Sequence, residues 1–213
     1  MNALVYCQSG GGKTVNSTLV RTGKRGRNLL ICTDNSSIVL NQFKRENLDI
    51  KNVTTVEGFV KEYEQGCECG KYDNIILDNL SDLFDMWILE LEDKGAYKDM
   101  RQAYQLVYQS LKRLSRKSAA ENCNTIFTAW SDLADITSPT GERTQRLQPK
   151  LPMKIIDNIC GLMNVVAYIN TANDKDGNKR WYFVTEGSPT LLAKDQILCR
   201  KSCLPEDIFG GEN

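Results

Sequence analysis

The chain has 213 residues, of which 41% are hydrophobic and 25% are charged, a composition typical of one globular domain that excludes a disordered chain. Its 27 basic and 27 acidic side chains cancel, so there is no overall positive field, and any contact with nucleic acid must come from a local patch. The absence of histidine excludes a Ser-His-Asp triad, histidine-ligated zinc and a histidine general base.

The first half of the chain alternates short apolar runs with helical patterns. Strands are expected at 2–6, 29–33 and 75–77, and helices from 13 to about 20 and at 36–44, 56–64 and 82–93. Residues 63–72 contain two glycines and predict a loop. Ser81 is the expected N-cap of the helix that begins at Asp82.

The second half begins with the clearest amphipathic helix, whose apolar residues recur at helical spacing from Met100 to Leu114. A strand at 125–129 follows, and residues 131–150, without periodicity and rich in turn formers, predict a long loop. The remaining elements are a helix at 152–160, a hairpin of strands 165–170 and 181–185, and a further strand at 191–193. Residues 206–213 are expected to form a flexible tail.

This alternation predicts an α/β fold with a mostly parallel central sheet and a C-terminal β-hairpin, in one domain over residues 1–205. Three of the runs, at 29–33, 75–77 and 125–129, are apolar without alternation, as expected for strands covered on both faces. The first residues lack a basic, apolar leader, and no apolar run approaches about 18 residues, so we expect no membrane segment and a cytoplasmic protein.

Cysteines are numerous, eight in all, and several lie inside apolar runs. In a protein without a secretory signal, reduced and buried thiols are expected. Two close pairs, Cys67 with Cys69 and Cys199 with Cys203, lack the C-x₂-C spacing of zinc knuckles, so we expect them to bind no metal.

The segment CQSGGGKT, residues 7–14, carries the strongest chemical signal. It follows a strand and opens a helix, the setting in which a glycine-rich loop cradles phosphates with its backbone N–H groups. The residues that would surround the phosphates are Ser9, Gly10, Gly11, Gly12, Lys13 and Thr14, with Lys13 on the β- and γ-phosphates and Thr14 on Mg²⁺. Cys7 stands where the motif has glycine. The alternative is a glycine-rich turn with a chance lysine.

Acidic and polar residues that end the predicted strands are candidates for the rest of the site. Asp78 ends the strand 75–77, where a carboxylate holds Mg²⁺ through water. Asp34 follows the strand 29–33 and either activates the attacking water or forms an Asx turn. Thr128 and Ser131 end the strand 125–129, where they either sense the γ-phosphate or only terminate the strand.

The order of these motifs resembles the RecA-like ATPase core. The stretches VYCQSGGGKT, YDNIILDNLSDLFD, NTIFTAW, PKLPMKIID and LLAKD are similar to compact phage and prophage P-loop proteins, which include single-strand annealing recombinases. The resemblance implies a three-layer fold, a Mg²⁺-dependent ATPase, ATP as ligand and single-stranded DNA as partner in recombination or replication. It also implies a ring or filament of identical chains in the cytoplasm of a bacterial host.

Further roles are implied only by this resemblance. Asp34 takes the place of a catalytic acid, and the loop 131–150, with Arg143, Arg146 and Lys150, that of a DNA-contacting loop. Lys194 stands where relatives begin a Lys-x-Arg finger that reaches a neighbour's γ-phosphate. The arginine position is Gln196, so turnover is expected to be slow unless Arg200 or Lys201 substitutes, since such a finger supplies ~10³–10⁵ in rate.

Two other functions remain open from the sequence. A P-loop kinase of a small molecule would use an arginine-containing lid, and the loop 131–150 has two arginines. A nucleotide-gated binding protein with little hydrolysis is compatible with Gln196. DNA-stimulated ATPase activity, a phosphorylated small product, or tight ATP binding without turnover would distinguish the three.

Overall fold

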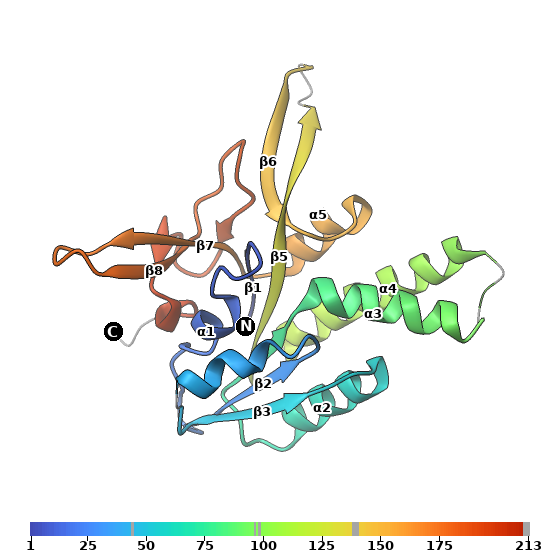
Figure 1. The fold of residues 1–213 in the computed structure, drawn as a ribbon, viewed down its shortest axis with the longest axis horizontal. Helices are drawn as coiled ribbons and strands as arrows, with labels where there is room; N and C mark the ends of the chain where they lie inside the picture. The colour runs from blue at the N-terminus through green and yellow to red at the C-terminus, as the bar shows by residue number, and fades with distance from the viewer. Residues whose placement is uncertain (44, 96, 98, 138–140, 211–213) are drawn as a thin grey trace.

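The computed structural model describes residues 1–43, 45–95, 97, 99–137 and 141–210. A sheet in the order β10-β8-β7-β1-β5-β4-β2-β3 runs through the molecule, with β6 paired to β5 and β9 to β7 (Figure 1). The pairs β1–β5, β1–β7, β4–β5, β2–β4 and β2–β3 are parallel. Those that involve β6, β8, β9 and β10 are antiparallel. The mostly parallel sheet predicted from the sequence is therefore present.

The strands have these bounds: β1 Asn2–Cys7, β2 Asn28–Cys32, β3 Leu48–Asn52, β4 Asn74–Asp78, β5 Asn124–Thr137, β6 Arg143–Pro149, β7 Val165–Asn173, β8 Lys179–Val184, β9 Lys194–Asp195 and β10 Ser202–Cys203. The helices have these bounds: α1 Lys13–Ser17, α2 Val56–Glu68, α3 Leu80–Asp93, α4 Met100–Ala120 and α5 Met153–Leu162, with 3₁₀ helices η1 Ser36–Gln42 and η2 Pro205–Asp207. Among the described residues, no helix is both long and apolar enough to cross a bilayer.

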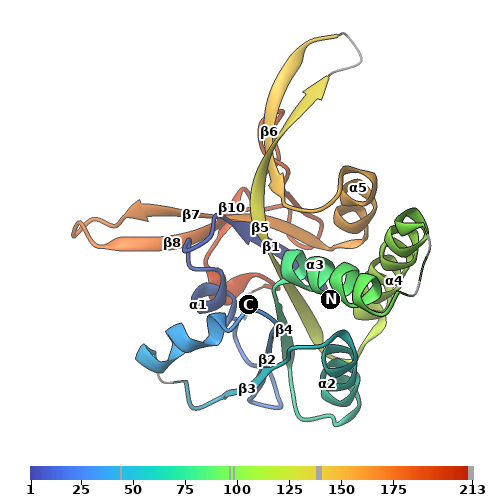
Figure 2. The ribbon, with the colours of Figure 1, turned by 45° about the vertical axis from the view of Figure 1, so that its right-hand side comes forward.

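Helices cover both faces of the sheet, which makes three layers (Figure 2). On one face α2, α3, α4 and α5 pack against a core that includes Leu4, Ile75 and Phe127. On the other face, Leu40 of η1 and Ile208, just after η2, belong to a smaller core around Val5 and Ile76, against which Val15 of α1 packs. Successive residues of β1 and β4 thus enter opposite cores, which explains their uninterrupted apolar sequence.

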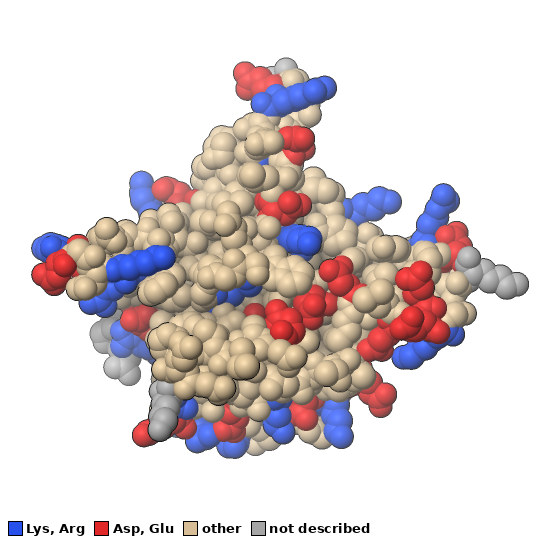
Figure 3. Space-filling model, in the orientation of Figure 1, with Lys and Arg blue, Asp and Glu red and all other residues tan. Residues whose placement is uncertain are grey.

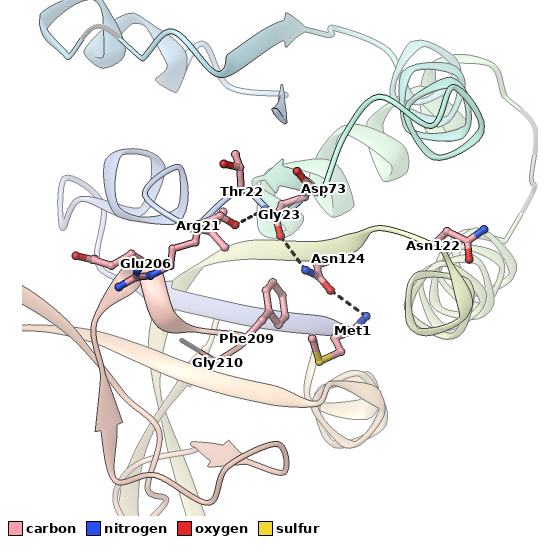
Figure 4. A pocket seen from close by; sticks show the side chains of 12 residues that line it. Met1, Arg21, Thr22, Gly23, Asp73, Asn122, Asn124, Glu206, Phe209 and Gly210 are labelled. Carbon is pink, nitrogen blue, oxygen red and sulfur yellow. Dashed lines mark hydrogen bonds between the residues drawn. The ribbon is translucent and has the colours of Figure 1, made fainter. Parts of the chain in front are cut away.

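Asparagines begin the central strands and form a hydrogen-bonded row along the starting edge of the sheet. The row consists of Asn2, Asn28, Asn74, Asn124 and Asn164. Nδ2 of Asn74 donates to Oδ1 of Asn28 at 2.8 Å, and Nδ2 of Asn124 donates to Oδ1 of Asn74 at 2.9 Å. A shallow pocket of about 610 Å³ borders this edge, where the Met1 amine donates to Asn124 (Figure 4). The row satisfies amide groups that would otherwise be buried unpaired.

The prediction of a long loop at 131–150 is wrong for the described residues of this segment. Strand β5 continues to Thr137 and returns as β6, giving an antiparallel hairpin that projects from the sheet (Figure 1). Its ladder bonds are made between its own two strands, so it needs no buried apolar face and leaves no periodicity in the sequence. Residues 138–140 of the predicted loop lie outside the described residues.

Other predicted elements differ in extent. The helix predicted to end at Glu64 runs to Glu68, because its apolar face continues to Gly66, which packs on β2 and β4. Asn79, not Ser81, caps α3, since its Oδ1 accepts from the Asp82 N–H at 2.7 Å. Helix α1 ends at Ser17 and not near residue 20, and the helix predicted at 36–44 is a 3₁₀ helix over Ser36–Gln42, with residue 44 outside the described residues. The edge strand β3 was not predicted, and β9 at Lys194–Asp195 replaces the strand predicted at 191–193.

The segment predicted as a flexible tail packs against the fold over its described part, residues 206–210. Ile208 is fully buried in the smaller core. Arg21 forms an ion pair with Asp207 at 2.7 Å, and Arg200 donates to the carbonyl groups of Asp207 and Ile208. Residues 211–213 lie outside the described residues.

Candidate functional site

A pocket of about 320 Å³ opens at the carboxyl ends of the parallel strands, where ligands bind in open α/β sheets. It is lined by Ser9, Gly10, Gly12, Lys13, Thr14, Val15, Asp34, Ser36, Ile38, Val39, Asp78 and Trp130. These residues follow or end β1, β2, β4 and β5, so the sheet brings together four segments that are distant in sequence. In Figure 3 the surface is hollowed beside the uncharged surface of η1. Lys13 is the one cation among the lining residues.

The phosphate loop of residues 7–14 turns through two glycines with positive φ, Gly10 at 74° and Gly12 at 88°. L side chains rarely adopt this backbone conformation, so the loop depends on glycine at both positions. No atom lies within 4 Å of where a Cβ on Gly10 would stand, so this side of the loop is open. Lys13 is 7% exposed, and its Nζ donates to the carbonyl of Gln8 at 3.2 Å. The loop therefore leaves an accessible backbone surface beside a fixed ammonium group.

Asp78 lies at the centre of the site and is 1% exposed. Three hydroxyl groups donate to its carboxylate: Thr14 at 2.5 Å, Ser36 at 2.7 Å, and Thr128. Burial raises its pKa above the ordinary value, the three hydroxyl donors oppose this, and the nearby Asp34 adds to it. A buried acid that lines a pocket and has a raised pKa is typical of a functional site.

The donors around Asp78 fit a magnesium ion. Mg²⁺ prefers hard oxygen ligands, and here the Thr14 hydroxyl and the Asp78 carboxylate are in direct contact beside the open loop. A cation would also offset the desolvated charge of Asp78. The residues present are thus suited to holding Mg²⁺ together with a phosphate group.

Asp34 forms the Asx turn that was one of the two interpretations made from the sequence, and its other role stays a prediction. Its Oδ1 accepts from the Ser36 N–H at 3.0 Å, which is an Asx turn, and the side chain also lines the pocket. Its Oδ2 accepts from Nδ2 of Asn79 at 2.7 Å. Since Asn79 also caps α3, one buried amide connects Asp34 to the start of that helix.

Sequence reasoning missed one contributor to the site, Ser36, and one neighbour of the glycine loop, Trp181, which is not among the residues lining the pocket. Ser36 binds Asp78 from the turn that follows β2, and a serine in a turn carries no signal of that role. Trp181 lies on β8, and its indole Nε1 is 3.2 Å from where a Cβ on Gly12 would stand. This contact joins segments far apart in sequence, so only the pairing of β7 with β1 could have revealed it.

The remaining predicted site residues are spread over the molecule. Thr128 contacts Asp78, whereas Ser131 lies further along β5, opposite Pro149, and is not among the residues lining the pocket. Lys194 pairs in β9 with Val166 of β7, near the starting edge of the sheet, away from its own phosphate loop. Its Nζ donates to the carbonyl of Gly161 and to Oε1 of Gln196.

The suggested substitutes for the missing arginine are engaged within their own chain. Arg200 pairs with the buried Asp195 at 2.6 Å and holds the segment 206–210. Lys201 lies 3.6 Å from Glu186 in an exposed pair.

Three basic residues predicted to contact DNA follow the projecting hairpin from tip to base. Arg143 is exposed and pairs with Thr137, and Arg146 lies 3.8 Å from Asp157. Lys150 stands at the base, with Nζ 5.2 Å from the Trp130 ring centroid. The hairpin thus carries two arginines that face opposite sides of β6, with Lys150 at its base beside the pocket-lining Trp130.

The paired cysteines considered as metal ligands lie in separate regions. Cys67 is on α2, over one part of the sheet, whereas Cys203 is on β10 at the sheet edge farthest from β3. The sulfur of Cys67 lies instead 3.9 Å from that of Cys123.

Comparison with known proteins relates this site to a family. A family model described as an AAA domain matches residues 1–197. The flagellar accessory protein FlaH from Methanocaldococcus jannaschii is 11% identical, with 94% of this chain and 82% of that chain covered and a TM-score of 0.45. An ATPase from the type III secretion system of pathogenic bacteria is 13% identical, with 79% and 51% covered and a TM-score of 0.52.

This chain therefore spans about half the length of the secretion ATPase. At this identity the likeness concerns the fold alone, and it confirms the RecA-like α/β class predicted from the sequence. A search of curated protein sequences found no match.

Proposed function

The chain belongs to the AAA domain family, with the fold of RecA-like P-loop ATPases, and from this premise we propose that it binds ATP with Mg²⁺ and hydrolyses it in the pocket around Asp78. Lys13 would contact the phosphates, and Thr14 with Asp78 would hold the metal ion. The single observation that supports this most is the 2.5 Å contact of Thr14 with Asp78 beside the open glycine loop.

Asp34 is the proposed general base, because it lines the pocket and is held by Asn79. Thr128, whose hydroxyl donates to the Asp78 carboxylate, would sense the γ-phosphate. Hydrolysis is expected to be slow in an isolated chain, since Lys13 is the one cation among the described residues that line the pocket, and ATP carries several negative charges.

Replacing Asn79 with serine is expected to lower turnover about tenfold while leaving ATP affinity unchanged. Serine remains a good N-cap but lacks the amide that holds Asp34, so the free energy of unfolding should change by less than about 1 kcal/mol. Steady-state ATPase assays and urea titrations measure the two effects. Asn79→Ala, which also loses the cap, is the matched control and should cost about 1 kcal/mol more. Wild-type turnover in Asn79→Ser beside an impaired Asp34→Asn would refute this role of Asn79.

A homo-oligomer, as a ring or filament, is part of the proposal. Lys194 lies away from its own phosphate loop, so it would contact a phosphate only in a neighbouring chain. If a neighbour completes the site, ATP turnover per chain should increase with protein concentration, and Lys194→Ala should remove the increase. Turnover per chain that is constant over a hundredfold range of concentration would argue against a shared site.

Single-stranded DNA is the proposed partner, bound along the β5–β6 hairpin, which would place the protein in recombination or replication. The support is the set of cations along the hairpin, with Arg143 and Arg146 on opposite sides of β6 and Lys150 at its base beside the pocket. The electrostatic field on this face does not favour DNA throughout, because acidic side chains gather along α3 and side chains of both signs occur at the hairpin tip (Figure 3). Binding would therefore depend on these few cations.

Affinity for a labelled single strand is expected to fall with salt, with a slope of log affinity against log salt of about −2 for three phosphate contacts. Arg143→Ala should reduce the magnitude of the slope by about 0.7, whereas Lys179→Ala, on the other hairpin, should leave it unchanged. Fluorescence anisotropy at several salt concentrations gives both values. Absence of binding at micromolar protein, or binding without salt dependence, would contradict the DNA proposal.

ATP hydrolysis with and without Mg²⁺ and single-stranded DNA tests the function as a whole. Stimulation by DNA supports the proposal. Phosphate transfer to an added small molecule would instead indicate a kinase, and tight ATP binding without turnover would indicate a nucleotide-gated binding protein.

A further inference from the structure

Two cysteine thiols, outside the nucleotide pocket, lie within contact of each other. Sγ of Cys123 and Sγ of Cys67 are 3.9 Å apart, although 56 positions separate them in the sequence. Cys67 lies in the last turn of α2, and Cys123 immediately precedes β5. Both are reduced in the structure. A disulfide requires an S–S distance of about 2.05 Å, so the two sulfurs would need to approach by about 2 Å.

The two thiols differ in access to solvent. Cys67 is partly exposed, whereas Cys123 is 4% exposed. In the hydrogen bond between them the Cys123 thiol donates to the sulfur of Cys67. The pair thus combines a thiol that solvent reaches with a buried thiol in contact with it.

We propose that Cys67 and Cys123 form an oxidisable thiol pair that hydroperoxides convert to an intramolecular disulfide. One thiolate attacks a peroxide oxygen, the O–O bond breaks, and the departing hydroxide takes up a proton to give water and a sulfenic acid. The second thiol attacks this sulfur, the S–S bond forms, the S–O bond breaks, and a second water leaves. Two thiols are thereby oxidised by two electrons, and one hydrogen peroxide is reduced to two waters.

The bridge would join the end of α2 to the start of β5, at Cys123, five residues before Thr128. It would close a long loop that includes β4, α3 and α4, and so restrict the unfolded chain. The expected consequence is a thermal midpoint higher by several degrees, with ATP affinity unchanged. This site is independent of the proposed ATPase activity, so failure of one leaves the other intact.

Treatment of the full chain with hydrogen peroxide is the test. We expect titratable thiols to fall from eight to six, a mass loss of two hydrogen atoms, and a cross-linked peptide containing Cys67 and Cys123, all reversed by dithiothreitol. Cys69→Ser, the matched control two residues away, should still form the bridge, whereas Cys67→Ser should not. A bridge between other cysteines, addition of oxygen without loss of hydrogen, eight persistent thiols, or a lower thermal midpoint would each overturn the proposal.

Discussion

Replacing Lys13 with alanine is expected to weaken ATP binding by roughly 30- to 3,000-fold and to reduce turnover below detection. Removing one member of a buried charged pair costs about 2–5 kcal/mol, and tenfold in affinity corresponds to about 1.4 kcal/mol. Among the described residues that line the pocket Lys13 is the one cation, and its Nζ lies within the glycine loop itself, where it donates to the carbonyl of Gln8. Isothermal titration calorimetry with ATP, and phosphate release under saturating ATP, measure the two effects.

The fold should survive the Lys13→Ala substitution, because its Nζ contributes only a bond to the carbonyl of Gln8. Circular dichroism and the urea midpoint check this. Lys112→Ala, which removes a cation on the exposed side of α4, is the matched control and should behave as the wild type. Equal turnover in Lys13→Ala and wild type would show that the glycine loop is not the active site.

Replacing Asp78 with asparagine is expected to lower the rate of Mg²⁺-dependent ATP hydrolysis by ~10²–10³ or more. The same substitution is expected to raise the free energy of unfolding of the nucleotide-free protein. Burial raises the pKa of Asp78, so its ionised form costs the folded state free energy once the pH exceeds the unfolded-chain value of about 4. The wild type should therefore lose stability relative to the variant as the pH rises from that value. Asparagine can still accept hydrogen bonds from the surrounding hydroxyl groups.

Urea unfolding at pH 5 and pH 8 tests this trade-off, and the advantage of Asp78→Asn should be larger at pH 8. Asp78→Ala is the informative comparison, because it leaves the hydroxyl groups of Thr14, Ser36 and Thr128 without their shared acceptor and should be destabilising. An Asp78→Asn variant that hydrolyses ATP normally, or whose relative stability falls with rising pH, would contradict this account of the site.

The central strands of the sheet were predictable because their burial constrains every residue of a short, continuous stretch of sequence. Strands covered on both faces must be apolar throughout, which marks 29–33, 75–77 and 125–129 in the sequence. The phosphate loop was predictable for a similar reason, since its glycines and lysine are adjacent. Asp78 followed from its position at the end of one of these strands.

The features that were missed depend on pairing or on distant contacts. β3 is an edge strand whose burial is only partial, so its sequence LDIKN resembles a loop. The β5–β6 hairpin pairs with itself outside the core. The preference for Asn79 over Ser81 as helix cap depends on where the chain leaves β4: Ser81 instead donates to the carbonyl of Lys150 and accepts from the Trp130 N–H.

The asparagine row also sets where Asp78 and Thr128 stand. Asn74 and Asn124 are directly paired, and Asp78 and Thr128 each follow their asparagine by four residues. A slip of β4 by two residues would move Asp78 by nearly 7 Å and would leave buried amides without partners, at about 1–3 kcal/mol each. Misaligned sheets are thus disfavoured by side chains at one end of the strands, and the correct alignment brings Asp78 and Thr128 into contact at the other end.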